Sequence, residues 1–180
     1  MRRVSAGALV EPAPDEMELH EIFKSATRAP DHGRLRPWRF LVVREAARAQ
    51  LGEVFMTAYQ RRNPEAQLAQ LERERAKPMR APLIIVVAAH VIPESNIPVI
   101  EQILSAAAAA QNIMLCTFAM GYGCAWKTGD SAYDDTVKAA LGLRTQDAIV
   151  GFMYLGTNAT PPRAPIDVDI DALVSTWTSS

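Results

Sequence analysis

Cysteine is scarce in this 180-residue sequence, which contains only Cys116 and Cys124. Two cysteines cannot form the disulfide framework of a small secreted protein, so the composition favours a reducing compartment, and we expect a cytoplasmic protein. Neither cysteine stands in a cluster of histidines and acids with the spacing of metal ligands, so we expect no metal site.

The sequence also lacks an excess of charge of either sign, because 19 lysines and arginines stand against 20 acidic residues. Without a net positive charge there is no overall field to attract nucleic acid or anionic lipid. The 49% of hydrophobic and 22% of charged residues are typical of a soluble globular protein. We expect residues 1–180 to form a single domain, with neither nucleic acid nor a membrane as a partner.

An apolar segment of signal-peptide length is missing from the start of the chain. One long apolar run, Ile103 to Met120, is at the lower limit of length for a membrane span. Its five consecutive alanines, 106–110, contribute little to insertion, and Gln111 and Asn112 follow directly. We interpret the run as a buried helix of a soluble protein.

Several catalytic motifs are absent as well. There is no glycine-rich dinucleotide loop after a strand, no Walker-type phosphate loop, no nucleophile elbow and no paired-histidine metalloprotease helix. A triad can be assembled on paper from His32, Asp31 and a serine, but nothing in the spacing selects it. Nucleophilic, metal and P-loop chemistry are therefore unsupported.

Hydrophobic periodicity and capping residues predict both helices and strands. We expect helices over 15–27, 45–61, 65–77, 99–120 and 134–141, and strands over 38–44, 83–89 and 147–157. Residues 124–130 predict a short strand that leads into a turn. The continuous apolar run Phe40–Val43 predicts a strand buried on both faces, and the alternating tail 166–177 predicts an edge strand. The pattern gives α+β or α/β, with a sheet of four or five strands flanked by helices. The helix over 99–120 is apolar on nearly every side, which suggests a subunit interface.

Three short segments concentrate hydrogen-bond donors that suit a phosphate group. They are Arg2-Arg3-Val4-Ser5, the loop from Arg28 to Arg39, and Trp126-Lys127-Thr128. The loop carries too many polar groups to bury without partners, so it is either solvated or folded around an anion. Taken alone, each segment is typical of solvent-exposed cationic side chains. The alternative is that all three segments converge on one phosphorylated ligand.

Matching stretches occur in the same order and spacing in a known family. The stretches are Arg2-Arg3 with a nearby serine, Glu11-Pro12-Ala13-Pro14, Arg28-Ala29-Pro30-Asp31-His32 with Pro37-Trp38 and Phe40, Arg80-Ala81-Pro82-Leu83-Ile84-Ile85, Gly121-Tyr122-Gly123, Trp126-Lys127-Thr128-Gly129, and Gln146-Asp147 with the run 149–157. The chain resembles the FMN-dependent nitroreductase family, specifically its small bacterial NAD(P)H nitroreductase branch. The resemblance extends over nearly the whole chain.

The resemblance implies an α+β fold with a mixed sheet, in an intertwined homodimer that holds FMN at the subunit interface. By the match, Arg2, Arg3 and Ser5 bind the phosphate, and Arg28 and His32 serve the flavin of the partner subunit. Ala125, Trp126 and Lys127 lie along the flavin and its phosphate tail. The C-terminal strand would cross to the other subunit.

Two departures from the family pattern concern the same site. The family usually has a helix before the Arg-Arg motif, where this sequence begins. In addition, Val4 separates the motif from Ser5, and Gly7-Ala8 replace a basic residue. These differences predict either weaker phosphate binding or a natural start that differs from Met1. Where the branch often has Met-Gln-Pro-Trp, this chain has Leu35-Arg36-Pro37-Trp38, which adds a cation.

The activity that the resemblance implies is that of an FMN-dependent NAD(P)H oxidoreductase. NADH or NADPH reduces the flavin and leaves, and a nitroaromatic, quinone or other electron-poor small molecule is then reduced in the same pocket. The flavin carries the chemistry, so we assign no residue as acid or base. Lys127, and after it Arg36, are candidates to stabilise the reduced flavin. The alternatives are a non-catalytic flavin-binding or storage dimer, and a small structural dimer without flavin.

Overall fold

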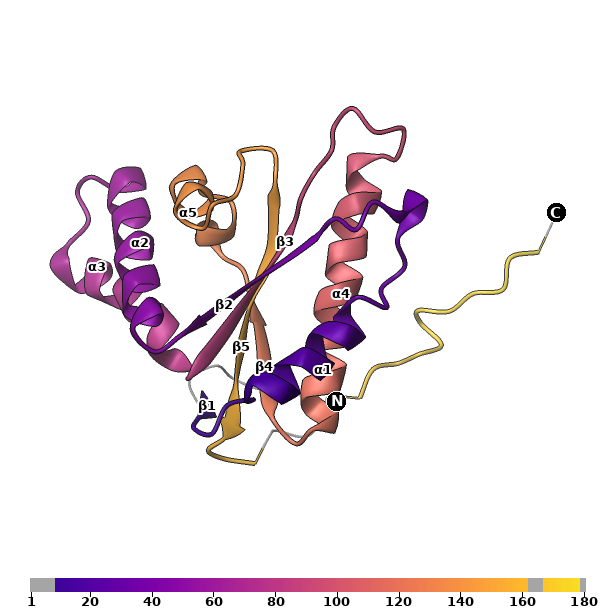
Figure 1. The fold of residues 1–180 in the computed structure, drawn as a ribbon, viewed down its shortest axis with the longest axis horizontal. Coiled ribbons are helices and arrows are strands. Elements are labelled where there is room, and N and C mark those ends of the chain that lie inside the picture. Colours follow the sequence, from indigo (N-terminus) through magenta and orange to yellow (C-terminus); the bar gives the residue numbers. More distant parts are fainter. Residues whose placement is uncertain (1–8, 162–166, 179–180) are drawn as a thin grey trace.

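The computed structural model describes residues 9–161 and 167–178 and shows one sheet with helices on both sides (Figure 1). In chain order the elements are β1 (Leu9–Val10), α1 (Glu16–Ala26), the 3-10 turn η2 (His32–Arg34), β2 (Trp38–Arg44), α2 (Ala46–Arg62), α3 (Leu68–Arg75), η3 (Lys77–Arg80), β3 (Leu83–Ala89), α4 (Val99–Ala119), β4 (Gly123–Lys127), η4 (Asp130–Ala132), α5 (Asp135–Ala140) and β5 (Ala148–Asn158). The fold is α+β, as expected.

The five strands form one sheet in which β3 lies between β2 and β5. Strands β1 and β4 also pair with β5, and all four described pairings are antiparallel. The strand number agrees with the expected four or five. Strand β1, a two-residue pairing, is an element that the sequence pattern did not predict.

Strand β3 organises the core because every one of its residues is buried. Its side chains alternate between the two sides of the sheet. Ile84 and Val86 pack with residues of α2 and α5, whereas Ile85 and Val87 pack with residues of α1 and α4. Helices α1 and α4 therefore cover one face and α2, α3 and α5 lie on the other (Figure 1), so β3 is buried on both faces.

Capping residues set the helix boundaries close to the predicted ones. Asp15 accepts from the backbone N–H of Glu18, and the Glu18 side chain accepts from that of Asp15, so a capping box begins α1. Asp134 caps α5 in a similar way through its contacts to Thr136 and Val137. Helix α3 is shorter than predicted because its capping box starts at Gln67.

Two strand predictions were wrong in part. Strand β2 forms over the predicted residues, but among the described strands it pairs only with β3, and it is half-buried: Val42 is 40% exposed, and only Val43 of this strand is buried. An apolar run indicates a strand without indicating how many neighbours it has. Residues 169–173 of the tail form a turn and not the predicted edge strand, because the Asp169 carboxylate accepts from the N–H groups of Asp171 and Ala172 and the Ile170 carbonyl accepts from Leu173. Ile166, the first residue of that prediction, lies outside the described residues.

Helix α4 is less covered than its composition suggests. By length and composition it is the one helix among the described residues that could cross a membrane, and 33% of its most apolar stretch is buried. It packs on α1 and the sheet through Ala109, Ala110 and Ile113. The side chains of Ile100, Leu104, Leu115 and Phe118 remain about half exposed.

Candidate functional site

The cationic loop between α1 and β2 has an unusual backbone. Gly33, Arg34 and Arg36 have φ values of 70°, 55° and 49°, in the left-handed region. For a residue other than glycine this conformation costs of order 1–3 kcal/mol and is concentrated at functional sites. Hydrogen bonds hold the loop in place: Asp31 accepts from the Arg36 N–H at 2.8 Å, and Arg39 Nη1 donates to the Arg36 carbonyl at 3.2 Å.

Helix α4 anchors this loop through one serine. The Ser105 hydroxyl donates to the Pro30 carbonyl at 2.6 Å and accepts from Trp38 Nε1 at 3.0 Å. Both ends of the loop are therefore fixed to the same point of α4. The loop is a pre-organised cationic surface, which favours a ligand-binding role over a freely solvated one.

Two of the predicted site residues, Arg28 and His32, lie at this loop. Both are exposed, and Arg28 forms no ion pair with a carboxylate in the described parts of the chain. His32 Nδ1 lies 2.6 Å from Oε2 of Glu101, in the first turn of α4. Arg36, the second candidate to stabilise a reduced flavin, stands on the same loop.

Three other predicted residues follow one another in β4. Ala125 is buried among the α2-side core residues, and Trp126 packs on the opposite side of the sheet. The Trp126 indole donates from Nε1 to the Val150 carbonyl at 3.1 Å and lies directly over Gly151, where a Cβ would approach Nε1 to 2.2 Å. Lys127, at the end of the strand, is exposed.

A cavity of about 200 Å³ lies beside Lys127, on the side of the sheet that carries α2. It contains three cationic side chains and no carboxylate in its lining. We call it the Lys127 pocket, lined by Phe55, Lys77, Arg80, Lys127, Thr128, Gly129, Ser131, Phe152 and Tyr154. The aromatic side chains supply an apolar surface, and the hydroxyl groups add donors, so the pocket suits an anionic aromatic ligand.

The charges around the Lys127 pocket are only partly neutralised. Lys77 pairs with the buried carboxylate of Glu74, whereas Lys127 and Arg80 form no ion pair with a described acidic residue. Burial raises the pKa of the Tyr154 hydroxyl to about 12, against the opposing effect of Arg80. This tyrosine therefore remains a neutral hydroxyl at physiological pH.

Lys77 and Arg80 are candidate site residues that sequence reasoning did not assign. Arg80 belongs to one of the stretches that carry the family resemblance, but its role was not apparent from the pattern. Lys77 belonged to a predicted helix of alternating charge. Only the fold brings η3, which holds both residues, next to the end of β4.

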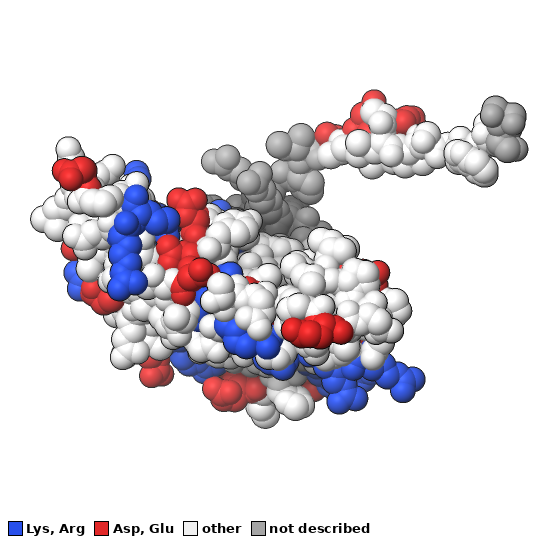
Figure 2. Space-filling view, turned by 90° about the horizontal axis from the view of Figure 1, so that it is seen from above, with Lys and Arg blue, Asp and Glu red and all other residues white. Residues whose placement is uncertain are grey.

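The structure does not bring all the predicted residues together within one subunit. Across residues 9–161 and 167–178, no hydrogen bond or described cavity joins Arg28 or His32 to Lys127. Arg2, Arg3 and Ser5 lie outside the described residues. On the face drawn in Figure 2, basic side chains form separate patches among acidic ones, so any attraction for an anion is local.

Comparison with known proteins identifies the family. A sequence model of the nitroreductase family matches residues 8–157. The Escherichia coli K12 protein named "Putative NAD(P)H nitroreductase YdjA" is 34% identical over 168 residues, which cover 93% of this chain and 91% of that protein. The fold is similar to that of a nitroreductase-like family protein from Bacillus cereus, with a TM-score of 0.80 at 23% identity over 98% of this chain and 92% of that one.

A second solved structure with this fold is a variant of NfnB from Sphingopyxis sp. strain HMH, described as an FMN and NADPH-dependent nitroreductase. Its TM-score is 0.72 at 21% identity, over 97% of this chain and 95% of that one. The family match covers most of the chain and agrees with the likeness in fold. The chain belongs to the nitroreductase family.

Proposed function

We propose that this protein is an FMN-dependent NAD(P)H oxidoreductase of the nitroreductase type, formed by residues 1–180 as one domain. The observation that carries the proposal is the Lys127 pocket, in which Lys77, Arg80 and Lys127 converge over an aromatic floor. Support comes from the family membership and from relatives named as nitroreductases that depend on NAD(P)H or on FMN and NADPH.

The residues of the Lys127 pocket fit FMN, which is aromatic and carries negative charge on its phosphate. Bound FMN would supply the redox chemistry, accepting a hydride from NADH or NADPH and passing it to an electron-poor acceptor such as a nitroaromatic or quinone. Lys127 and Arg80 stabilise negative charge on the cofactor because no described carboxylate neutralises them. Thr128 and Ser131 contribute hydroxyl donors, and the Phe55 and Phe152 rings limit the access of water.

A homodimer is part of the proposal, because one subunit offers only part of a cofactor site. The Lys127 pocket, at about 200 Å³, is smaller than the roughly 300–1,000 Å³ of most small-molecule sites. Arg28 and His32 lie apart from it and would complete the site of the partner subunit. The exposed apolar residues of α4, including Ile100 and Leu104, would form the interface, since large exposed apolar patches mark contacts between proteins.

The oxidoreductase and the storage alternative differ in how they respond to reductant. Purified protein should bind FMN with a shift of its absorbance, and anaerobic NADH or NADPH should bleach the bound flavin. Comparing the two nucleotides by stopped-flow would also establish which is preferred. Flavin that stays oxidised would indicate a storage protein, and protein that binds no FMN would contradict both.

A further inference from the structure

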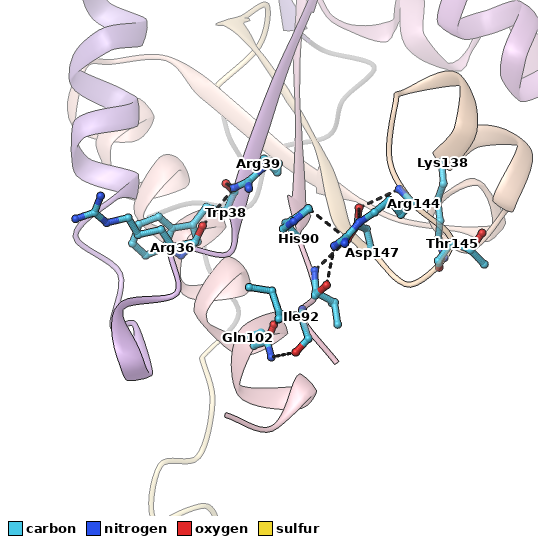
Figure 3. Close-up of polar contacts among 11 residues, drawn as sticks. Arg36, Trp38, Arg39, His90, Ile92, Gln102, Lys138, Arg144, Thr145 and Asp147 are labelled. Carbon is cyan, nitrogen blue, oxygen red and sulfur yellow. Dashed lines mark hydrogen bonds and ion pairs between the residues drawn. The ribbon is translucent and has the colours of Figure 1, made fainter. Parts of the chain in front are cut away.

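A second cavity, of about 360 Å³, shares no lining residue with the Lys127 pocket. It lies between the start of β2, the end of β3 and the turn that joins α5 to β5 (Figure 3). We call it the Arg39 cavity, lined by Arg39, Phe40, Leu41, His90, Leu141, Gly142, Leu143, Arg144 and Asp147. Its volume is within the range of small-molecule sites.

A buried carboxylate fixes one wall of the Arg39 cavity. Asp147, 2% exposed, accepts hydrogen bonds from Nε and Nη2 of Arg144, at 3.2 and 2.7 Å, and from the N–H of Val91 at 3.0 Å. Arg144 Nη2 also donates to the Val91 carbonyl at 2.6 Å. Although burial alone would raise the pKa of Asp147, these hydrogen bonds hold it below its ordinary value, so Asp147 stays ionised. The guanidinium of Arg144 is therefore held rigidly.

Donors of two arginines remain unused around this cavity. Arg39 donates from Nη1 to the carbonyls of Arg36 and Trp38, and its Nε and Nη2 make no hydrogen bond to the described residues. Nη1 of Arg144 is likewise unused among them. In the close-up of Figure 3 the His90 ring lies near Asp147, 3.7 Å from Nδ1 to Oδ1, which is too long for a hydrogen bond.

The charge of the lining sets the charge of a matching ligand. Arg39 and Arg144 contribute two positive charges and Asp147 one negative charge, so these three side chains together carry a net charge of about +1. Glu94, the other carboxylate that acts on Arg144, does not line the cavity. A monoanion would neutralise this charge, whereas a phosphate dianion would leave an excess of negative charge.

The remaining walls are apolar. Leu41, Leu141 and Leu143 line the cavity together with Phe40. Gly142, with a φ of 71°, forms the tight turn that places two of these leucines on either side of it. Such walls would exclude water from an apolar ligand body and gain free energy by burying it.

We propose that the Arg39 cavity binds a small organic molecule with one carboxylate and an apolar body. Arg39 and Arg144 bind the carboxylate, because two guanidinium groups offer planar donors that match its oxygens. The three leucines contact the apolar body. The proposal does not depend on flavin, since it uses no residue of the Lys127 pocket.

The experiment is a titration of the isotope-labelled full-length protein, as purified with any cofactor that it retains, with benzoate, followed by amide NMR shifts. We expect saturable shifts centred on residues 39–41 and 141–144. Benzamide, the neutral analogue, and inorganic phosphate should each bind about tenfold more weakly or not at all. Absence of saturable shifts, shifts centred on residues 127–131, or phosphate binding as tight as benzoate would each overturn the proposal.

Variants separate the two cavities. Arg39→Gln should weaken benzoate binding about tenfold, and Leu143→Glu should abolish it by placing a negative charge in the wall. Lys127→Gln, in the other pocket, and Arg73→Gln, on the exposed surface of α3, are the matched controls and should leave the affinity unchanged. Thermal melts would show that each variant is folded, and unaltered affinity in both folded cavity variants would contradict the assignment.

Discussion

The imidazole Nδ1 of His32 lies 2.6 Å from the Oε2 atom of Glu101, 69 residues away in the sequence. Because a carboxylate can only accept, the hydrogen bond places the proton of His32 on Nδ1. The other ring nitrogen, Nε2, is then left to contact a ligand. Glu101 therefore orients the predicted flavin-contacting histidine from the start of α4, as outer carboxylates do for many functional histidines.

Replacement of Glu101 should remove the hydrogen bond that orients the His32 ring without unfolding the protein. We expect Glu101→Ala to weaken FMN binding about fivefold, the equivalent of about 1 kcal/mol for a hydrogen bond to a partly exposed carboxylate. Glu101→Gln keeps a hydrogen-bond acceptor and should weaken FMN binding less than Glu101→Ala does. Fluorescence quenching of FMN measures the affinity, and the ¹⁵N shifts of the His32 ring report the tautomer. Glu65→Ala, at an exposed position, is the control; unchanged FMN affinity and unchanged ring shifts in Glu101→Ala would contradict this role.

The cations of the Lys127 pocket should contribute more to the affinity for FMN than Glu101 does. Lys127→Gln and Arg80→Gln are each expected to weaken FMN binding by roughly tenfold to a hundredfold, since hydrogen bonds to charged groups are worth about 1.5–3 kcal/mol. The salt dependence of binding should fall in both variants. Lys24→Gln removes a surface cation paired with Glu21 and serves as the control. Equal FMN affinity in all three variants would place the cofactor elsewhere.

The buried Asp147 makes folding stability depend on pH. The ordinary pKa of an aspartate is 3.8, and the folded-state pKa of Asp147 is lower because of its hydrogen bonds to Arg144 and Val91. Its stabilising effect is therefore complete above about pH 4 and is lost as the pH falls through the folded-state value. Asp147→Asn should lose about 2–3 kcal/mol of unfolding free energy at pH 7.

Urea unfolding of both proteins as a function of pH measures this effect. The difference in unfolding free energy between the natural protein and Asp147→Asn should become progressively smaller below pH 4. Asp167→Asn, which replaces an exposed aspartate, should unfold like the natural protein at every pH. A difference that stays constant down to the lowest pH would show that the ionisation of Asp147 is not its source.

The contact between Gly151 and Trp126 leaves no room for a side chain. A Cβ on Gly151 would come within 2.2 Å of Trp126 Nε1 and 2.6 Å of its Cδ1. The indole is held at this position by its hydrogen bond to the Val150 carbonyl. Gly151→Ala should therefore destabilise the protein by about 1–3 kcal/mol and change its tryptophan fluorescence. Gly121→Asn, at an open left-handed turn, should be tolerated. Equal stability of the two variants would contradict the close packing of Trp126.

The sequence predicted those elements whose limits depend on local chemistry. Asp15 and Asp134 mark helix starts because their side chains bond to backbone groups within three residues. It did not predict that β2 is half-buried, because exposure depends on the number of neighbouring strands. The tail was misread because an alternation of Ile and Asp has the period of a strand, yet the carboxylate of Asp169 stabilises a turn instead.

The candidate site was predictable only in part for a similar reason. The family resemblance pointed to Arg28, His32 and Lys127, and all three are exposed and able to contact a ligand. Lys77 and Arg80 were not assigned, because their proximity to Lys127 arises from the packing of η3 against the sheet. The pairing of His32 with Glu101 likewise joins residues that no local pattern connects.

The position of β3 in the sheet has a consequence for biosynthesis. This fully buried strand ends at Ala89, but one of its two partners, β5, begins only at residue 148 of 180. On the ribosome, the most apolar strand of the protein therefore leaves the exit tunnel long before its second neighbour is made. Non-local pairing of this kind slows folding and leaves apolar edges open to other chains. Chaperones should thus be required to shield the nascent protein until more than four-fifths of its sequence has been translated.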